Sequence, residues 1–339
     1  MAIFRLKSAF KDYLWGGTRL RDEYGKDCDY DKVAESWELS CHKDGASVVA
    51  DGDDAGLTLQ EYIDKAGREV LGTNCRRFEN FPILIKLIDA KDNLSVQVHP
   101  DNEYAQRVEG EYGKTEMWYV VDCDEGAELL YGFKGEITKE EFARRIKDNT
   151  LLEVTNNVPV HKGDVFFIKS GTLHAIGKGI LIAEIQQNSN TTYRIYDYGR
   201  VGKDGRQREL HIDKALDVTK LCPAEQYPDV PEVEENGAVI KLMARCEYFT
   251  TYRVDVEEKA EFTADESSFV SLLILEGEPV LRGSYMFRDE SSTAPLSKRD
   301  VKINARKGDS IFVSAGVGKF TLEGKCRFVL TRIDDMGQQ

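Results

Sequence analysis

Alternating and continuous apolar runs recur along the chain and predict a mainly β protein. ESWELS at 35–40 alternates in polarity, and FPILIKLIDA at 81–90 is a nearly unbroken apolar run, both of which are typical of strands. Residues 116–133 have the pattern strand, turn, strand, and glycines divide 163–186 into further short strands. Antiparallel units of this kind with regularly spaced glycines indicate closed β-barrels or jelly rolls.

Helical periodicity is confined to a few short segments. Residues 57–72 and 210–218 each have the spacing of a short amphipathic helix. The best helical pattern covers 137–150, where Thr138 is the expected N-cap and Glu141, three residues later, would complete a capping box. The helices are therefore expected to be small additions to a β framework.

An internal repeat supports two β units. GDVFFIKSGTLH at 163–174 resembles GDSIFVSAGVGK at 308–319, and each is preceded by a similar apolar strand and turn. The first copy ends in His174 and the second in Lys319. An imidazole can bind a metal ion at that position, whereas an ammonium group repels one. We therefore expect chemistry in the first unit only.

The connection between the units is expected in the acidic, proline-rich stretch at 222–237. We predict a metal-binding catalytic domain at 1–235 and a degenerate β domain at 236–339. A chain of 339 residues is long enough for two domains, and it can bury a hydrophobic core without stabilising disulfides. No run approaches the roughly 20 apolar residues of a membrane helix.

Charge and cysteine content narrow the functional classes. The formal net charge is −14, which repels nucleic acid and anionic membranes. An anionic substrate would therefore need a locally basic site. The seven cysteines are scattered and include no C-x-x-C, and the N-terminus has no apolar signal region, so we expect a cytoplasmic protein. We expect it to act on a small molecule as a monomer or weak homodimer.

Candidate chemistry begins at NLSVQVHP, residues 93–100. Strand side chains alternate between faces, so Ser95, Gln97 and His99 share one face and the apolar residues between them face a core. A single histidine there, taken alone, is better explained as a hydrogen-bonded core residue. A polar face of this kind in a barrel instead suggests a ligand-binding surface.

Four residues together indicate a metal site. The spacing from Gly163 to His174 matches the second conserved motif of the cupins, although Lys169 replaces the usual proline. Gln97, His99 and Glu116 would take the places of the first motif. Two imidazoles, one carboxylate and one amide oxygen suit a divalent ion such as zinc. The pattern predicts two cupin-type barrels, the first competent to bind metal.

Longer motifs carry a family resemblance. They are WGG (15–17), ESWELS (35–40), SVQVHPDNEYA (95–105), GKTEMWYV (113–120), GTLHAIG (171–177), EIQQNSNTTYRIYDYGR (184–200) and LHIDKALDV (210–218). In this order they resemble the type I mannose-6-phosphate isomerases of the cupin superfamily, in their shorter bacterial form. The resemblance covers about 1–218, and beyond it only the layout is similar.

The resemblance implies a function and a site. The function is interconversion of D-mannose 6-phosphate and D-fructose 6-phosphate through a cis-enediolate. The implied metal is one zinc ion per chain, held by Gln97, His99, Glu116 and His174. The implied catalytic residues are Arg194, Glu184 and Lys114, and Ser95 and Lys86 would bind the substrate and its phosphate.

Each of these residues also has a simpler explanation. Arg194 would stabilise developing oxyanions, or it forms an ion pair with Asp197. Glu184, in an apolar strand, is either paired or has a raised pKa suited to a general base. Lys114 shares the face of Glu116 or is solvated, and Lys86 faces the phosphate or a protein carboxylate. Which residue abstracts the proton stays open.

Two other functions fit parts of the pattern. One is a non-catalytic sugar-binding cupin that senses carbohydrate, but a sensor would not need Arg194, Glu184 and Lys114 together. The other is an iron-dependent cupin dioxygenase, against which Gln97 and the TYR segment at 192–194 both argue.

Overall fold

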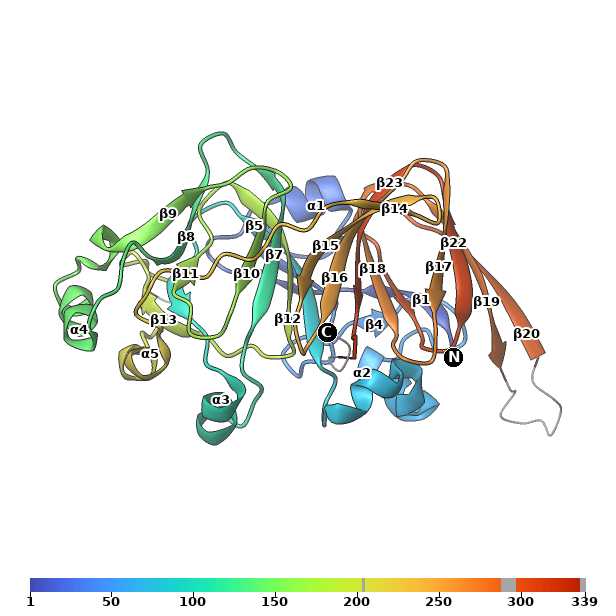
Figure 1. The fold of residues 1–339 in the computed structure, drawn as a ribbon, viewed down its shortest axis with the longest axis horizontal. Coiled ribbons are helices and arrows are strands. Elements are labelled where there is room, and N and C mark those ends of the chain that lie inside the picture. Colours follow the sequence, from blue (N-terminus) through green and yellow to red (C-terminus); the bar gives the residue numbers. More distant parts are fainter. Residues whose placement is uncertain (203–204, 288–296, 336–339) are drawn as a thin grey trace.

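The computed structural model describes residues 1–202, 205–287 and 297–335 and shows two β units side by side, which we call the first and the second barrel (Figure 1). The first barrel is formed by two sheets. One has the order β10(Val165–Ile168)-β7(Glu116–Cys123)-β12(Ile180–Gln187)-β5(Ile83–Ala90)-β3(Glu35–Leu39)-β2(Ala9–Lys11). The other has the order β13(Tyr193–Tyr196)-β6(Val96–Val98)-β11(His174–Ala175)-β8(Glu128–Phe133)-β9(Thr155–Pro159). The mainly β, cupin-like fold class is confirmed.

The second barrel also has two sheets. The larger has the order β14(Val233–Glu235)-β15(Ala238–Arg245)-β16(Thr250–Val256)-β23(Cys326–Arg332)-β18(Val270–Gly277)-β21(Ser310–Val313)-β1(Ile3–Lys7)-β4(Val48–Val49). The smaller is β17(Lys259–Ala264)-β22(Gly318–Glu323)-β19(Val280–Phe287)-β20(Ser297–Asn304). Because β1 and β4 belong to this barrel, the N-terminal strand crosses the division that we predict at residue 235.

Three of the helices correspond to predicted ones: α2(Leu59–Ala66), α4(Lys139–Lys147) and α5(Ile212–Val218). The 3₁₀ turn η1(Arg68–Leu71) also falls within the predicted segment 57–72, whereas α1(Arg19–Tyr24), α3(Asn102–Val108) and the 3₁₀ turns η2(Thr73–Arg77) and η3(Leu151–Glu153) lie outside the predicted helical segments. None of the described helices is long and apolar enough to cross a membrane.

The N-cap of α4 is only partly as predicted. Thr138 accepts a hydrogen bond from the Glu141 backbone nitrogen at 3.1 Å. The Glu141 side chain turns to Arg145 instead of back to the N-cap. The reciprocal capping box is found at Thr58 of α2, so α4 has half of the predicted motif.

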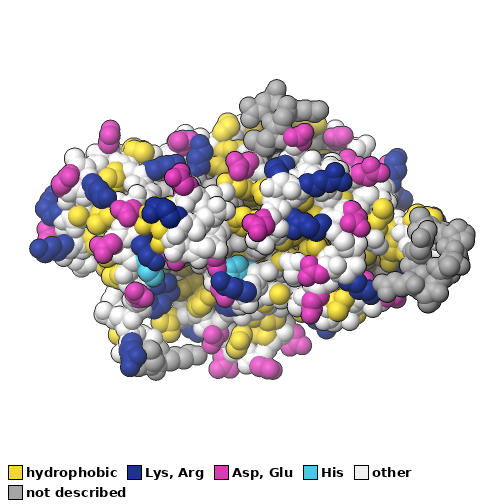
Figure 2. Space-filling model, turned by 90° about the horizontal axis from the view of Figure 1, so that it is seen from below, with side chains coloured by type: hydrophobic (Ala, Val, Ile, Leu, Met, Phe, Trp, Pro, Cys, Tyr) yellow, Lys and Arg dark blue, Asp and Glu magenta, His cyan; other side chains and the backbone are white. Residues whose placement is uncertain are grey.

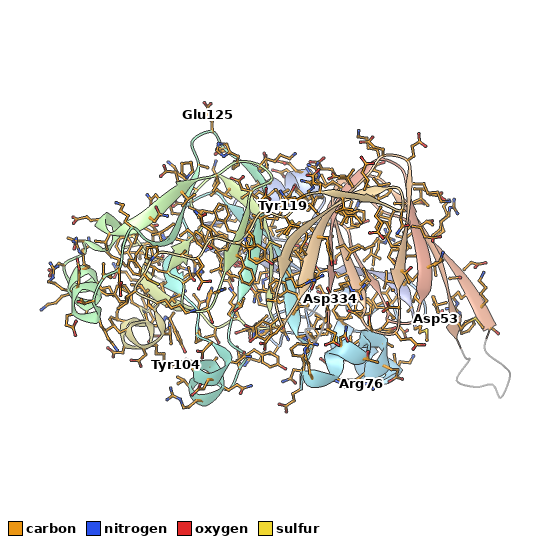
Figure 3. All side chains as sticks on the ribbon, in the orientation of Figure 1. Asp53, Arg76, Tyr104, Tyr119, Glu125 and Asp334 are labelled. Carbon is orange, nitrogen blue, oxygen red and sulfur yellow. The ribbon has the colours of Figure 1, made fainter. Side chains whose placement is uncertain are left out.

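Burial on both faces explains the unbroken apolar strands. The outer face of the first barrel's larger sheet packs against the second barrel, and Ile85 and Tyr119 share one apolar cluster with Phe312. Figure 3 shows Tyr119 where the two barrels meet. The apolar residues Val96 and Val98, between the polar positions of β6, face outward into a cluster that includes side chains of α4 and α5. The polar face of β6 is thereby turned into the barrel.

The second barrel has an apolar interior where the first has polar groups. In the first barrel Glu116 pairs with Ile168 across β7 and β10. At the corresponding place in the repeat, Val270 pairs with Val313. Lys319 points to solvent, with 72% of its side chain exposed, and contacts Glu261 at 2.6 Å. The second unit therefore differs from the first at the position of Glu116 as well as at the position of His174.

We expect this second barrel to bind no metal. Among the described residues, the only group of three or more histidine, cysteine or acidic side chains placed to hold an ion is in the first barrel. Anomalous diffraction from zinc-soaked crystals provides the measurement. A strong zinc peak among residues 240–339 would contradict this prediction.

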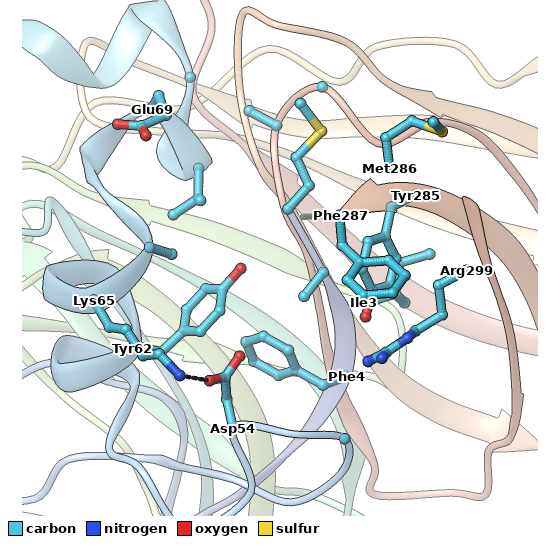
Figure 4. A pocket seen from close by; sticks show the side chains of 18 of the residues that line it. Ile3, Phe4, Asp54, Tyr62, Lys65, Glu69, Tyr285, Met286, Phe287 and Arg299 are labelled. Atoms are coloured by element: carbon cyan, nitrogen blue, oxygen red, sulfur yellow. Dashed lines mark hydrogen bonds and ion pairs between the residues drawn. The ribbon is translucent and has the colours of Figure 1, made fainter. Parts of the chain in front are cut away.

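A cavity of about 900 Å³ lies where α2 faces β19 (Figure 4). Phe4, Tyr62, Tyr285 and Arg299 are among the residues that line it. It contains none of the predicted site residues and is therefore separate from the polar interior of the first barrel.

Candidate metal centre and active site

Strand register places three predicted residues in one row on the inner face of the smaller sheet. His174 of β11 pairs with Gln97 of β6, and Gln97 pairs on its other side with Arg194 of β13. Directly paired residues of antiparallel strands project from the same face. Sequence spacing could align Gln97 with His99, but only the pairing of distant strands brings His174 and Arg194 alongside.

The opposite sheet contributes a second row. Glu184 of β12 pairs with Lys86 of β5 on one side and with Trp118 of β7 on the other. The Trp118 indole donates a hydrogen bond to Glu184 Oε2 at 2.9 Å. Glu116, at the start of β7, lies on this same face and reaches across the barrel to the histidines.

Three predicted ligands converge at one point. The Nε2 atoms of His99 and His174 lie 3.1 Å apart, and Glu116 oxygens lie 3.6 Å from the first and 3.5 Å from the second. Ligand atoms around a tetrahedral zinc ion are roughly 3.3–3.5 Å apart, given bonds of about 2.0–2.2 Å. All three side chains are buried, and Glu116 Oε1 has no hydrogen-bond partner. These residues fit a metal ion.

The histidine tautomers also suit metal binding. His99 Nδ1 lies 2.9 Å from the Thr191 carbonyl, and His174 Nδ1 lies 2.8 Å from the Thr172 carbonyl. Each carbonyl fixes the proton on Nδ1 and leaves the Nε2 lone pair free. Burial lowers the pKa of His174 to about 4, and burial and then Lys114 lower the pKa of His99. Both rings are therefore neutral, as ligands must be.

Gln97 lies at the edge of this group. It is half-buried, its Nε2 lies 3.4 Å from His174 Nε2, and Ser95 donates a hydrogen bond to its Oε1 at 3.4 Å. A half-turn of the amide exchanges oxygen and nitrogen, so the oxygen can face the same point. Ser95 accordingly contacts the site through Gln97, and its substrate contact stays a prediction.

Lys114 connects the metal centre to the second row. Its Nζ lies 2.8 Å from Glu116 Oε2, 3.2 Å from His99 Nε2 and 3.8 Å from Glu184 Oε1. The side chain is buried, so the solvated alternative is wrong. Burial, reinforced by Glu184, raises the pKa of Glu116 to about 7. Among the described residues, Lys114 is the only cation that lies within 4 Å of both the Glu116 and the Glu184 carboxylates.

Glu184 is the paired carboxylate of the two alternatives. Burial alone would raise its pKa, but Lys114 and Lys86 outweigh burial and lower the pKa to about 2. The alternative of a raised pKa is therefore not supported, and Glu184 is ionised at neutral pH. These cationic neighbours stabilise the ionised form and make Glu184 a weak base in this structure.

Lys86 faces protein carboxylates in this structure. Its Nζ lies 3.2 Å from Glu184 Oε1 and 3.6 Å from Glu35 Oε2, and Trp37 donates a hydrogen bond to the same Glu35 oxygen. Burial opposes its charge, but Glu35 and Glu184 raise its pKa. The sequence alone does not identify Glu35 as a partner of Lys86. The segment ESWELS contains two glutamates, and nothing in it shows which of them faces inward.

We expect Lys86→Met to destabilise the fold. The substitution keeps the volume but leaves Glu35 and Glu184 buried beside each other without their shared cation, which typically costs about 3–5 kcal/mol. Urea denaturation followed by tryptophan fluorescence measures this loss. Adding Glu35→Gln to the variant should restore part of the stability. A loss below about 1 kcal/mol for the single variant would show that this ion pair contributes little.

Arg194 is not paired with Asp197. Its Nη1 donates to the Glu209 carbonyl at 2.9 Å, and its Nε is buried without a partner. Asp197 instead accepts hydrogen bonds from Arg200 and from Arg208. Burial and then Arg208 lower the pKa of Arg194. A guanidinium group with an unsatisfied buried donor is available to an anionic ligand.

Comparison with known proteins gives the family. The sequence profile of "phosphomannose isomerase type I, catalytic domain" matches residues 3–130. Mannose-6-phosphate isomerase ManA of Bacillus subtilis is 36% identical over 329 residues, covering 96% of this chain and 98% of its own length.

Two solved structures share the fold. The mannose 6-phosphate isomerase from Bacillus subtilis has a TM-score of 0.86 at 35% identity and covers 98% of this chain and 99% of its own. A zinc-bound mannose 6-phosphate isomerase is 16% identical with a TM-score of 0.73, covering 99% and 100%. With motifs, fold and full-length similarity in agreement, this chain belongs to the type I mannose-6-phosphate isomerase family.

Proposed function

We propose that this protein is a metal-dependent isomerase that interconverts D-mannose 6-phosphate and D-fructose 6-phosphate through a cis-enediolate. The observation that carries the proposal is the convergence of His99, Glu116 and His174 beside the Lys114–Glu184 pair. Family membership favours this function over a non-catalytic sugar sensor. We propose one zinc ion per chain, with Gln97 as its fourth ligand, supported by the zinc-bound relative of the same fold.

The reaction moves a proton between C2 and C1 of the sugar, which requires an acid–base group beside both carbons and stabilisation of oxygen charge. A bound zinc ion supplies positive charge that polarises sugar oxygens. Glu184 and Lys114, whose charged atoms lie 3.8 Å apart, are the proposed acid–base groups, and which residue abstracts the proton stays open. Arg194 directs its free donor at the enediolate oxygen that carries the developing charge.

Local charge supports an anionic substrate. Arg194, Arg200 and Arg208 carry three positive charges against one on Asp197, which leaves a net charge of +2 in a protein of net charge −14. The face drawn in Figure 2 shows acidic and basic side chains interspersed. We propose that Ser95 and Lys86 contribute to the same substrate surface, Lys86 through its charge.

Cellular setting and assembly are also proposed. The seven cysteines are unpaired, which supports a reducing, cytoplasmic location. We propose a monomer or a weak homodimer that takes a small sugar phosphate.

A coupled assay combined with metal analysis tests the proposed function. Purified protein is assayed for fructose 6-phosphate formation before chelation, after chelation and after zinc is added back, while bound metal is measured in parallel. We expect activity to follow zinc content. Zinc-loaded protein that does not turn over mannose 6-phosphate would contradict the proposal, and oxygen uptake would favour the iron dioxygenase.

A further inference from the structure

The orientation of His99 depends on a carbonyl that lies in a loop. His99 Nδ1 contacts the Thr191 carbonyl at 2.9 Å, and residues 188–192 connect β12 to β13 without regular structure. His174 differs, because its partner carbonyl, Thr172, is two residues away in the same turn. A loop carbonyl can fix a ring only if the loop itself is fixed.

Glu111 contacts this loop at the residue that carries the carbonyl. Its carboxylate accepts a hydrogen bond from the Thr191 hydroxyl at 3.4 Å. Glu111 lies between α3 and β7, and 21% of its side chain is exposed. The residue that carries the carbonyl is therefore bonded directly to the Glu111 carboxylate.

The Glu111 carboxylate is fixed in turn by the segment 42–44. Lys43 Nζ lies 2.6 Å from Oε1, and His42 Nε2 lies 3.7 Å from Oε2. The buried His42 accepts a hydrogen bond at Nδ1 from the Asp44 backbone nitrogen, so the neutral ring carries its hydrogen on Nε2, toward Glu111. Asp44 adds a direct contact to the loop, because its Oδ2 accepts from Asn190 Nδ2 at 2.8 Å.

We propose that Glu111, supported by His42, is a positioning residue of the metal centre. It holds the 188–192 loop so that the Thr191 carbonyl keeps His99 Nε2 directed at the metal. Glu111 contacts none of the proposed metal ligands itself and acts only through Thr191. Since it concerns the metal that His99 would bind, this inference rests on the proposed function.

Zinc affinity is the deciding measurement, made by titrating the apoprotein against a chromogenic zinc chelator. We expect Glu111→Ala to weaken zinc binding about tenfold to a hundredfold, the usual consequence of losing support behind a metal-binding histidine. Glu111→Gln should stay close to wild type, because its amide oxygen can still accept the hydrogen bond from the Thr191 hydroxyl. Glu109→Ala is the matched control, since that glutamate also pairs with a lysine, Lys214 at 2.7 Å, but accepts its other hydrogen bond from Tyr193 of β13 and not from residues 188–192.

Thr191→Val tests the same inference even if Glu111→Ala does not fold. It removes the hydroxyl bond to Glu111, keeps the carbonyl that His99 uses, and removes no charge. We expect weaker zinc binding than in wild type, and less weakening than in Glu111→Ala. Affinities of Thr191→Val and of any folded Glu111→Ala within twofold of Glu109→Ala would overturn the inference. Failure of the proposed function has a different signature, because the wild-type protein itself would then bind no zinc.

Discussion

His99→Ala and His174→Ala are each expected to abolish tight zinc binding and isomerase activity. Both Nε2 atoms lie within 3.6 Å of Glu116 and 3.1 Å of each other, so the loss of either leaves three ligands, one of them a weakly binding amide. Zinc content after dialysis should fall from about one per chain to a small fraction. Metal analysis and the coupled assay provide the measurement.

The control for this prediction is His161→Ala. His161 lies in the same barrel, but 81% of its side chain is exposed and its contact is Asp164. It should keep wild-type zinc and activity. The ligand assignment would be wrong if either core variant, folded by circular dichroism, retained full zinc and turnover.

Arg194→Ala is expected to fold, keep its zinc and lose at least about a hundredfold in kcat, with a smaller change in KM. Arg194 lies beside Gln97 in the inner row and has a buried Nε without a partner. A donor of this kind interacts more strongly with the charged enediolate than with the neutral sugar atoms, and losing one typically costs about 3–4 kcal/mol of transition-state stabilisation.

Two variants sharpen this test. Arg194→Lys should recover only part of the activity, because an ammonium group lacks the planar fork of donors. Arg253→Ala removes another partly buried arginine, which pairs with Asp255 in the second barrel, and should leave kcat unchanged. If Arg194 instead anchors the phosphate, KM would rise steeply while kcat stayed nearly constant, and the assigned role would fail.

Several features of this protein follow from the sequence by itself. Strand periodicity and glycine spacing predict the β architecture, because alternation of side chains is a local property of the chain. The repeat that ends in His174 and Lys319 predicts that one barrel carries chemistry and the other does not. The capping pattern at Thr138 locates α4, although the Glu141 side chain pairs with Arg145 instead of the N-cap.

Only the tertiary structure decided which charges meet. Lys86 is conspicuous in its apolar strand, yet its partners Glu35 and Glu184 come from strands about fifty residues before and one hundred after it, so strand pairing alone identifies them. The same pairing decides that Glu184 is ionised, because its pKa depends on how close Lys114 and Lys86 lie.

Pairing between distant strands also bears on the predicted domain division. Composition predicts a boundary at residue 235, but β1 pairs with β21, more than three hundred residues away along the chain. Likewise, Gln97 and His99 share a face by local geometry, whereas the alignment of Arg194 with Gln97 and the support of His99 by Thr191 require a complete barrel. Local sequence determines which groups this protein can offer, and long-range packing determines which of them act together, because electrostatic and hydrogen-bond energies depend on distances that spacing along the chain does not specify.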